Sequence, residues 1–337
     1  MKVALLTPTF SRFSGIDRVL QLDAEEYSKK GDDVTIFTLR STMDSKVAEV
    51  VEIGMPKNPF LERIYRLFFF LDYGKVKKYS KMLKDYDLVV SYFYPMNWLA
   101  YNAKKKFGVK YKYYNFGVAF PQLFSFFERI YMKLFVMFNK FTLKNCDEAT
   151  SISDYLRKEL KRETGIGGGV EYCRIDKKRF HKDVDGSKIR EKYGFGDEKV
   201  LLYVGRISPH KGVDLLIKSF NLVLDKIPDA KLFIVGKPTF DKYFNKLKKL
   251  VKKNVIFTGF VRDEELPEYY AACDLYVTAT LWEGFDLPVV ESQEMGKEVV
   301  AFDLCSHPEI VKGGALVKPR DVEGFADAIL RLLKKNE

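Results

Sequence analysis

The chain has 337 residues, 47% of them apolar and 31% charged, a composition that excludes a disordered chain and a membrane-spanning bundle. This length exceeds the usual size of one hydrophobic core and predicts two domains. The net charge is +11, and residues 1–170 hold 28 Lys and Arg against 19 Asp and Glu, a surplus of +9. No zinc-finger, helix-turn-helix or RNA-binding signature accompanies this charge, so we expect no nucleic-acid partner.

The first half of the chain alternates apolar strands with amphipathic helices, which predicts a parallel doubly wound sheet. Because the first strand starts at the N-terminus and does not resemble a signal peptide, we expect a cytoplasmic protein. The predicted strands are Lys2–Thr7, Asp33–Thr38, Val47–Ile53, Leu88–Ser91, Tyr111–Tyr114, Glu148–Ile152 and Val170–Cys173. The predicted helices are Asp17–Lys30, Phe60–Asp85, Phe120–Asn145 as one helix or a pair of helices, and one that begins at Ser153.

Two segments of this half, Phe60–Tyr73 and Phe116–Phe141, are rich in aromatic and basic residues. Such helices are typical of proteins that lie on an anionic membrane surface, and we predict peripheral attachment to the inner face of the cell membrane. Core packing of one helix face is the alternative. In the second segment Phe124, Phe126, Phe127, Tyr131, Leu134, Phe135, Met137, Phe138 and Phe141 alternate with Arg129, Lys133, Lys140 and Lys144.

The glycine-rich segment Gly165–Gly169 is interpreted as a linker, because no helix with a lysine follows it as in a phosphate-binding loop. The predicted domains are therefore 1–170 and 171–337. The second domain repeats the alternation, with predicted helices at Val213–Ile227 and Asp321–Lys335. Its predicted strands are Lys199–Val204, Lys231–Val235, Val255–Thr258, Asp274–Thr278, Glu298–Ala301 and Ala315–Val317.

The four cysteines are far apart in the sequence and lack the CxxC spacing of zinc sites. We therefore predict buried free thiols and no metal site. The cysteines are Cys146, Cys173, Cys273 and Cys305.

The segment Trp282–Glu291 places two carboxylates eight positions apart across a predicted loop and the first turn of a helix. Asp286 is the predicted N-cap, so Glu283 lies in the loop and Glu291 about one turn inside the helix. Both follow a buried strand and lie at the edge where open α/β sheets bind ligands. The alternative is that neither residue binds a ligand: Glu283 would be an acidic residue of a surface loop, and Glu291 an acidic residue in the first turn of the helix, where it interacts favourably with the helix macrodipole.

The segment Val200–Gly212 is also a strand that leads into a loop and a helix. Arg206 and Lys211 flank a loop bounded by Gly205 and Gly212, beside a helix start whose unpaired N–H groups favour an anion. Two cations at a helix start indicate a diphosphate site. A carboxylate in the same cleft accepts hydrogen bonds from vicinal sugar hydroxyls, so the combination indicates a nucleotide-sugar.

Together the two motifs resemble the retaining glycosyltransferases of family 4, which have the GT-B fold of two Rossmann-like doubly wound domains facing across a cleft. The resemblance covers residues 199–335 well and 1–170 in outline. It continues through Gly296, Pro308–Val311, Leu316–Pro319 and Phe325–Ile329.

The resemblance implies transfer of a hexose from a nucleotide-diphosphate sugar to an acceptor hydroxyl, with retention and with no metal or other cofactor. The first domain would be the acceptor side, with a lipid-linked glycan or a lipid as acceptor, and the second would bind the donor. Glu283 would bind the donor sugar and Glu291 the ribose. The implied catalytic residues are Arg206, Lys211 and Glu283, and the implied donor-binding residues are Gly15, Gly205, Val261, Gly284, Phe285, Asp286, Leu287 and Glu291.

The sequence departs from relatives at three positions. Relatives often carry two adjacent glycines where this chain has Ser14 and Gly15, so Gly15 is either backbone that approaches the donor phosphate or the acceptor, or part of an ordinary tight turn. Many relatives place a histidine near the donor sugar where this chain has Asn115, which is either an acceptor-side residue or a turn residue. Most relatives carry glycine in place of Asp286.

Two other functions remain open at the level of the sequence. One is a nucleotide-sugar epimerase of the same architecture, which product analysis without an acceptor would distinguish. The other is a non-catalytic nucleotide-sugar-binding protein or membrane partner subunit, which would bind the donor without turnover.

Overall fold

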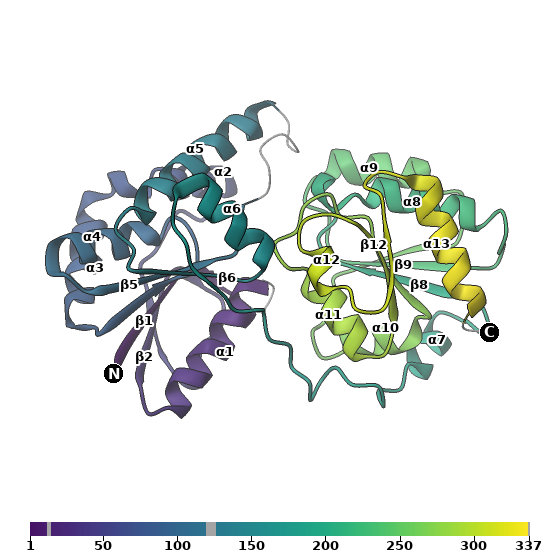
Figure 1. The fold of residues 1–337 in the computed structure, drawn as a ribbon, viewed down its shortest axis with the longest axis horizontal. Coiled ribbons are helices and arrows are strands. Elements are labelled where there is room, and N and C mark those ends of the chain that lie inside the picture. Colours follow the sequence, from purple (N-terminus) through teal and green to yellow (C-terminus); the bar gives the residue numbers. More distant parts are fainter. Residues whose placement is uncertain (12–14, 119–125, 336–337) are drawn as a thin grey trace. The chain divides into compact units, whose positions relative to one another are not determined.

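The computed structural model describes residues 1–11, 15–118 and 126–335 and divides the chain into two compact units (Figure 1). Unit 1 comprises Met1–Arg174 and unit 2 comprises Ile175–Glu337, a division that falls a few residues after position 170. Each unit is built around one parallel sheet. The predicted fold class, two doubly wound α/β domains, is confirmed.

The sheet of unit 1 has the strand order β3-β2-β1-β4-β5-β6-β7, and its neighbouring strands run parallel. The strands are β1 (Lys2–Phe10), β2 (Asp33–Ser41), β3 (Glu49–Glu52), β4 (Leu88–Ser91), β5 (Lys110–Asn115), β6 (Glu148–Ser151) and β7 (Gly169–Val170). The strand predicted over Val170–Cys173 is wrong in extent, because β7 ends at Val170 and the chain then leads towards unit 2.

The helices of unit 1 are α1 (Gly15–Lys29), α2 (Pro59–Leu67), α3 (Tyr73–Met82), α4 (Asn97–Phe107), α5 (Phe126–Leu143) and α6 (Asp154–Thr164). The single helix predicted over Phe60–Asp85 is wrong. The α-helix ends at Leu67, and the Asp72 side chain accepts a hydrogen bond from the Lys75 N–H (3.1 Å) and caps α3. The break allows Phe69 to be fully buried in the core. A continuous helix could not bury all of the three consecutive phenylalanines, because neighbouring helical positions point in different directions.

The sheet of unit 2 has the order β10-β9-β8-β11-β12-β13 and is also parallel. Its strands are β8 (Val200–Val204), β9 (Lys231–Val235), β10 (Val255–Gly259), β11 (Leu275–Thr278), β12 (Glu298–Phe302) and β13 (Gly314–Val317). Its helices are α7 (Ser187–Lys192), α8 (Val213–Val223), α9 (Asp241–Leu250), α10 (Leu266–Ala272), α11 (Leu287–Glu294), α12 (His307–Ile310) and α13 (Val322–Lys335).

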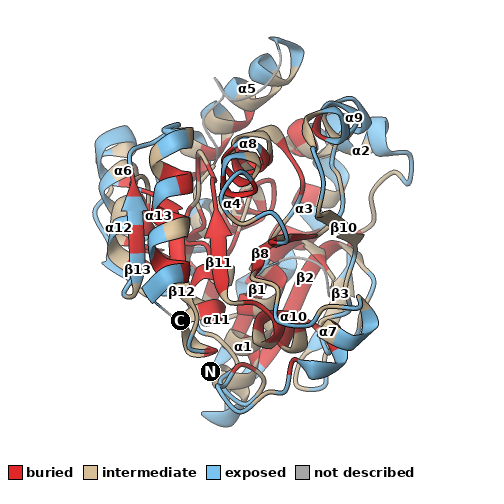
Figure 2. Ribbon diagram, turned by 90° about the vertical axis from the view of Figure 1, so that its right-hand side faces the viewer, coloured by how far each residue is buried: buried red, intermediate tan, exposed pale blue. Residues whose placement is uncertain are grey.

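The central strands of unit 2 are buried except for one half-buried end residue each in β8 and β12, as the largely red β8, β11 and β12 of Figure 2 show. Helices cover them on both faces, which explains the continuous apolar runs that predicted these strands. The chain proceeds from β8 outward to β9 and β10, then returns to β11 on the other side of β8. The connections after β8 and β11 therefore diverge and leave a crevice at the carboxyl edge of the sheet.

Candidate functional site

The two sequence motifs follow β8 and β11 at the carboxyl edge of the unit 2 sheet. The loop 205–212 connects β8 to α8, and the loop 279–286 connects β11 to α11. The two strands are paired neighbours at the point where the strand order reverses. This is the position at which open α/β sheets bind ligands.

Gly212 brings the two loops together. Its φ is 61°, a left-handed conformation that glycine adopts without strain, and an added Cβ would lie 1.9 Å from the Ala279 carbonyl oxygen. The Leu281 N–H donates to the His210 carbonyl oxygen (2.8 Å) across the same gap. A side chain at position 212 would therefore push apart the loops that carry Lys211 and Glu283.

Lys211 and Glu283 form an ion pair in the structure, although they are 72 positions apart in the sequence. Their side chains are only 14% and 19% exposed. Lys211 ends the short 3-10 turn before α8, and Glu283 lies in the loop before α11. The structure thus places a cation and a carboxylate from the two motifs in direct contact at the crevice, where partial burial strengthens their interaction.

Arg206 lies at the other end of the β8 loop and is exposed. The Tyr203 hydroxyl donates to the Arg206 carbonyl oxygen (3.1 Å) and fixes the backbone there. Within the described residues the Arg206 guanidinium has no ion-pair partner. Its five N–H donors are therefore available to an anionic ligand.

Glu291 lies about one turn inside α11, as predicted, and is 2% exposed. The Tyr270 hydroxyl donates to its Oε2 atom (2.8 Å). Burial and the neighbouring Glu291 carboxylate raise the pKa of Tyr270 well above its usual value, so this hydroxyl stays a donor. The contact fixes the Glu291 side chain in one orientation.

Asp286 occupies the N-cap position of α11, but its side chain does not cap the helix. Its φ is 69°, and its Oδ2 atom lies 3.0 Å from His307 Nε2 in a buried contact. Burial favours a raised pKa for this carboxyl, but the His307 hydrogen bond and the Lys211 charge lower the pKa below its usual value. The prediction of a side-chain cap is therefore wrong, because the carboxylate turns inward to a histidine that follows β12.

His210 lies between Arg206 and Lys211 in the sequence and is buried. Burial, followed by the charges of Lys211 and Arg206, lowers the pKa of its imidazole to about 3. The ring is therefore neutral near pH 7 and adds no third positive charge to the loop.

The other predicted donor-binding residues of unit 2 are distributed over three loops. Gly205 follows β8, and Gly284 and Phe285 lie between Glu283 and Asp286. Phe285 is buried, and Leu287 is the first residue of α11. Val261 follows β10, two strands away from β8 in the sheet.

Of the two residues predicted in unit 1, Asn115 is the last residue of β5 and Gly15 lies in the connection from β1 to α1. The Asn115 amide donates to Ser151 Oγ (3.1 Å) and the Leu156 carbonyl (3.3 Å) and accepts from the Gly117 N–H (3.0 Å). These bonds favour the turn-residue interpretation of Asn115. Gly15 is the first residue of α1, and residues 12–14 before it lie outside the described residues.

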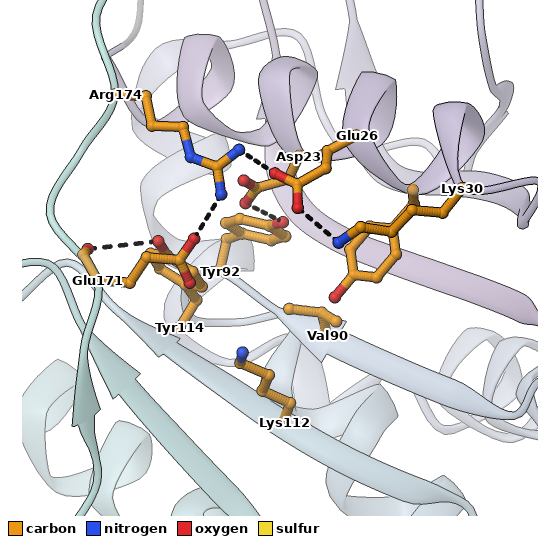
Figure 3. A pocket seen from close by; sticks show the side chains of 10 residues that line it. Asp23, Glu26, Lys30, Val90, Tyr92, Lys112, Tyr114, Glu171 and Arg174 are labelled. Atoms are coloured by element: carbon orange, nitrogen blue, oxygen red, sulfur yellow. Dashed lines mark hydrogen bonds and ion pairs between the residues drawn. The ribbon is translucent and has the colours of Figure 1, made fainter.

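Unit 1 also contains a cavity of about 170 Å³ that no sequence motif predicted (Figure 3). The Tyr92 hydroxyl donates to Asp23 Oδ2 (2.7 Å), and Arg174 bridges Glu26 and Glu171. The lining residues come from α1, from β4 and β5 and from the chain after β7: Asp23, Glu26, Tyr27, Lys30, Val90, Tyr92, Lys112, Tyr114, Glu171 and Arg174.

Asp23→Asn is expected to stabilise the protein at neutral pH. Burial, opposed by the Tyr92 hydrogen bond, raises the pKa of Asp23 from 3.8 to about 6. Because the folded state binds the proton more tightly, the unfolding free energy falls as the pH rises from about 4 to about 6. Removing the titrating group should raise the unfolding free energy by up to about 3 kcal/mol at pH 7.5 and should leave it unchanged below pH 4.

Urea unfolding at pH 7.5 and pH 4 measures this difference. Asp44→Asn, the same change at an exposed position, is the control and should leave the unfolding free energy unchanged at both pH values. An Asp23→Asn effect that is equal at the two pH values would contradict the assigned pKa.

None of the four cysteines forms a disulfide bond; Cys173 and Cys273 are buried, and Cys146 and Cys305 are half-buried. Among residues 1–11, 15–118 and 126–335, no group of three or more His, Cys, Asp and Glu side chains is placed to hold a metal ion.

Two parallel-sheet units, with paired charges from two motifs at a switch point, define the class of doubly wound α/β proteins that have a candidate ligand site at the carboxyl edge of the sheet. Comparison with known families gives the particular family. Residues 185–337 match the model described as "Glycosyl transferases group 1", and residues 13–170 match "Glycosyltransferase Family 4". The chain therefore belongs to the group 1 family of glycosyltransferases.

Individual relatives are similar over part or all of the chain. A GDP-mannose-dependent alpha-(1-6)-phosphatidylinositol monomannoside mannosyltransferase of Mycolicibacterium smegmatis is 30% identical over 207 residues, 56% of this chain and 53% of that protein. The chain thus matches about half the length of this curated relative. Sucrose-phosphate synthase from Thermosynechococcus elongatus has a similar fold, with a TM-score of 0.81 at 21% identity over 99% of this chain and 90% of that chain. Anabaena HepE, solved in complex with UDP-glucose, has a TM-score of 0.77 at 20% identity, over 100% of this chain and 90% of that chain.

Proposed function

We propose that this protein transfers a hexose, with retention, from a nucleotide-diphosphate sugar to an acceptor hydroxyl. The observation that supports this most is the Lys211–Glu283 ion pair at the switch point of the unit 2 sheet, beside the exposed Arg206. A diphosphate is bound by cations at such a site, and a carboxylate binds sugar hydroxyls. Unit 2 is then the donor-binding domain and unit 1 the acceptor-side domain.

In this mechanism the bond between the sugar anomeric carbon and the diphosphate oxygen breaks, and a bond to the acceptor oxygen forms on the same face. The acceptor proton passes to the leaving phosphate oxygen, so no protein nucleophile is assigned. Negative charge develops on the diphosphate, and Arg206 and Lys211 are preorganised to stabilise it without a metal ion. Glu283 orients the sugar hydroxyls and holds Lys211 in place, and Glu291 binds the ribose.

The relatives indicate which donors to try first. One is named as GDP-mannose-dependent, and another was solved with UDP-glucose. A thermal-shift screen of GDP-mannose, UDP-glucose and further nucleotide-sugars tests the proposal, because a ligand that binds only the folded state raises its stability by RT ln(1 + [L]/Kd). At 100 times Kd the gain is about 2.7 kcal/mol.

Product analysis completes the test. The donor that gives the shift should release nucleoside diphosphate in step with glycosylated acceptor. Conversion of the donor to an isomer without acceptor would instead favour an epimerase, and binding without any turnover would favour a non-catalytic protein.

We propose a lipid or lipid-linked acceptor reached from an anionic membrane surface on the inner face of the cell membrane. The supporting feature is the aromatic surface of unit 1, formed by exposed side chains of two helices that meet where the Tyr131 hydroxyl donates to the Arg63 carbonyl (3.4 Å). The aromatic surface comprises Phe60, Leu61 and Ile64 of α2 and Phe126, Phe127, Ile130, Met137 and Phe141 of α5.

Core packing explains the opposite face of α5 and part of the environment of Phe141, which also packs on Trp98 and Tyr101 of α4. Phe135 is buried against Tyr94, and Phe138 packs on Phe68 and Phe70, whereas Phe126 and Phe127 are 68% and 82% exposed. Phe124 lies outside the described residues. No helix in the described part of the chain is long and apolar enough to cross a membrane. The proposed attachment is therefore peripheral.

Vesicle flotation tests this attachment. Each basic residue near an anionic surface contributes about 1 kcal/mol, so we expect salt-sensitive flotation with phosphatidylglycerol vesicles. Lys133 lies on α5 and Lys144 directly follows it, and both are exposed. The double variant Lys133→Glu with Lys144→Glu should weaken vesicle binding at least about tenfold. Lys140 is left unchanged because it pairs with Glu163 (3.1 Å).

The matched control is Lys188→Glu with Lys192→Glu on α7 of unit 2, which makes the same change in net charge at exposed positions. Equal losses of vesicle binding in both double variants would show that binding depends on the net charge of the protein and not on the aromatic surface of unit 1. Absence of flotation at low salt would direct the search for the acceptor to soluble glycans.

A further inference from the structure

Tyr270 of α10 and Glu291 of α11 are in direct contact, although β11 separates their helices in the sequence. The Tyr270 hydroxyl donates to Glu291 Oε2 over 2.8 Å, and the two residues are 0% and 2% exposed. The two oxygens of a carboxyl group are joined rigidly, so a bond to Oε2 also restricts where Oε1 can lie. The phenol of Tyr270 therefore sets the orientation of the carboxyl group.

The ring of Tyr270 is itself held by two other aromatic rings. Phe180 meets it edge-on, with 5.8 Å between the ring centroids, and Tyr276 of β11 lies at 6.0 Å. Both neighbouring side chains are buried. Because protein interiors are close-packed, a ring in this position cannot turn without displacing its neighbours. The Tyr270 hydroxyl is thus in place before a ligand binds.

The backbone after Tyr270 is fixed by two cations from other segments. Arg190 of α7 donates from Nη1 to the Ala272 carbonyl oxygen (2.7 Å), and Lys297 donates from Nζ to the Ala271 carbonyl oxygen (3.0 Å). These carbonyl groups lie in the last turn of α10, where carbonyls have no partner inside the helix and where positive charge is favourable. The contacts hold the end of the helix that carries Tyr270.

A carboxyl group in one orientation can distinguish ribose from deoxyribose. A hydrogen bond weakens steeply when donor and acceptor are misaligned, and the two vicinal hydroxyls of ribose have fixed positions on one ring. We propose that Tyr270 is a positioning residue that makes the donor site selective for ribose, because it holds Glu291 in the orientation that accepts hydrogen bonds from these hydroxyls. This inference rests on the proposed function, in which Glu291 binds the ribose. Tyr270 is fully buried, so we assign it no contact with the substrate.

Nucleotides with and without the ribose hydroxyls test this role. Isothermal titration calorimetry compares GDP and UDP with 2′,3′-dideoxy-GDP and 2′,3′-dideoxy-UDP. The unaltered protein should bind the ribonucleotide at least about tenfold more tightly, since a site that binds a hydroxyl rejects the analogue without it. Tyr270→Phe keeps the ring and removes the hydroxyl. It should reduce the preference for ribose about 3-fold to 10-fold, the contribution of one hydrogen bond, and leave the Kd of the dideoxy nucleotide unchanged.

Tyr269→Phe is the matched control, because it removes the hydroxyl of the neighbouring buried tyrosine of α10, which lies 3.1 Å from the Tyr193 hydroxyl. The control should lower the unfolding temperature about as much as Tyr270→Phe and leave the preference for ribose unchanged. With GDP-mannose or UDP-glucose as donor, Tyr270→Phe should raise KM and leave kcat unchanged, because ribose binding is shared by ground state and transition state.

Equal weakening of both nucleotides by Tyr270→Phe would show a purely structural role and overturn the proposal. An unchanged preference for ribose in this variant would overturn it too. If the unaltered protein binds the ribonucleotide no better than the dideoxy analogue, Glu291 does not bind the ribose and this inference fails, while the diphosphate site of Arg206 and Lys211 is not affected. If the thermal-shift screen finds no nucleotide that binds, the proposed function fails, and this inference fails with it.

Discussion

Lys211→Ala is expected to lower the rate of glycosyl transfer by about 100-fold to 1000-fold, the usual cost of losing one preorganised group that stabilises developing charge. Lys211 is held by Glu283 at the crevice and is only 14% exposed, so its ammonium is in place before the reaction begins. Arg206→Ala should have an effect of similar size. Its guanidinium flanks the other end of the same loop.

Single-turnover rates with a saturating donor measure these losses. Lys218→Ala on α8 is the matched control, because it removes an exposed lysine that follows the same loop by two turns. Unchanged turnover in both Arg206→Ala and Lys211→Ala would remove the diphosphate assignment. Chelators should leave the rate of the unaltered protein unchanged, and strict dependence on a divalent metal ion would contradict stabilisation by these two cations.

The position of the two motifs could be predicted from the sequence because the signals are local. A run of apolar residues defines each central strand, and glycines mark the loop that follows it. Parallel strands bring their carboxyl ends to one edge of the sheet, so Lys211 and Glu283 were expected near each other. Gly212 against Ala279 shows how close the loops come, which no sequence pattern specifies.

The contact between Asp286 and His307 could not be predicted, because it depends on the path of the chain. The two residues are 21 positions apart, and β12 lies between them. A residue before a helix is read as an N-cap from its type alone. The structure shows that the segment after β12, which pairs with β11, brings His307 to this carboxylate (3.0 Å).

Tertiary packing also decided the break between α2 and α3. The periodicity of Phe60–Asp85 favoured a continuous helix, but the structure buries Phe69 fully and ends the α-helix before it. The cavity lined by Asp23 and Tyr92 is a similar case. Its residues come from four separate segments of unit 1, and none of them belongs to a recognisable motif.

The two glutamates of the site should respond differently to loss of charge. Glu291→Gln is expected to raise the donor KM about 10-fold to 100-fold with little change in kcat, because ribose binding is shared by ground state and transition state. A hydrogen bond to a charged group contributes about 1.5–3 kcal/mol, which gives this range. The Tyr270 hydroxyl can still donate to the glutamine oxygen, so the fold around position 291 should persist.

Glu283→Gln should instead lower kcat, by about 100-fold, because the change removes the ion pair that holds Lys211 beside the reacting diphosphate. Glu294→Gln is the control for both, since Glu294 lies on the same helix as Glu291 and pairs only with the exposed Lys177 (3.1 Å) among the ion pairs of the described residues. Steady-state kinetics over a range of donor concentrations separate the two parameters. Equal and negligible effects of Glu283→Gln and Glu291→Gln would show that neither residue has a role in donor binding. Glu283 would then be an ordinary acidic residue of the loop, and Glu291 one that interacts only with the helix macrodipole.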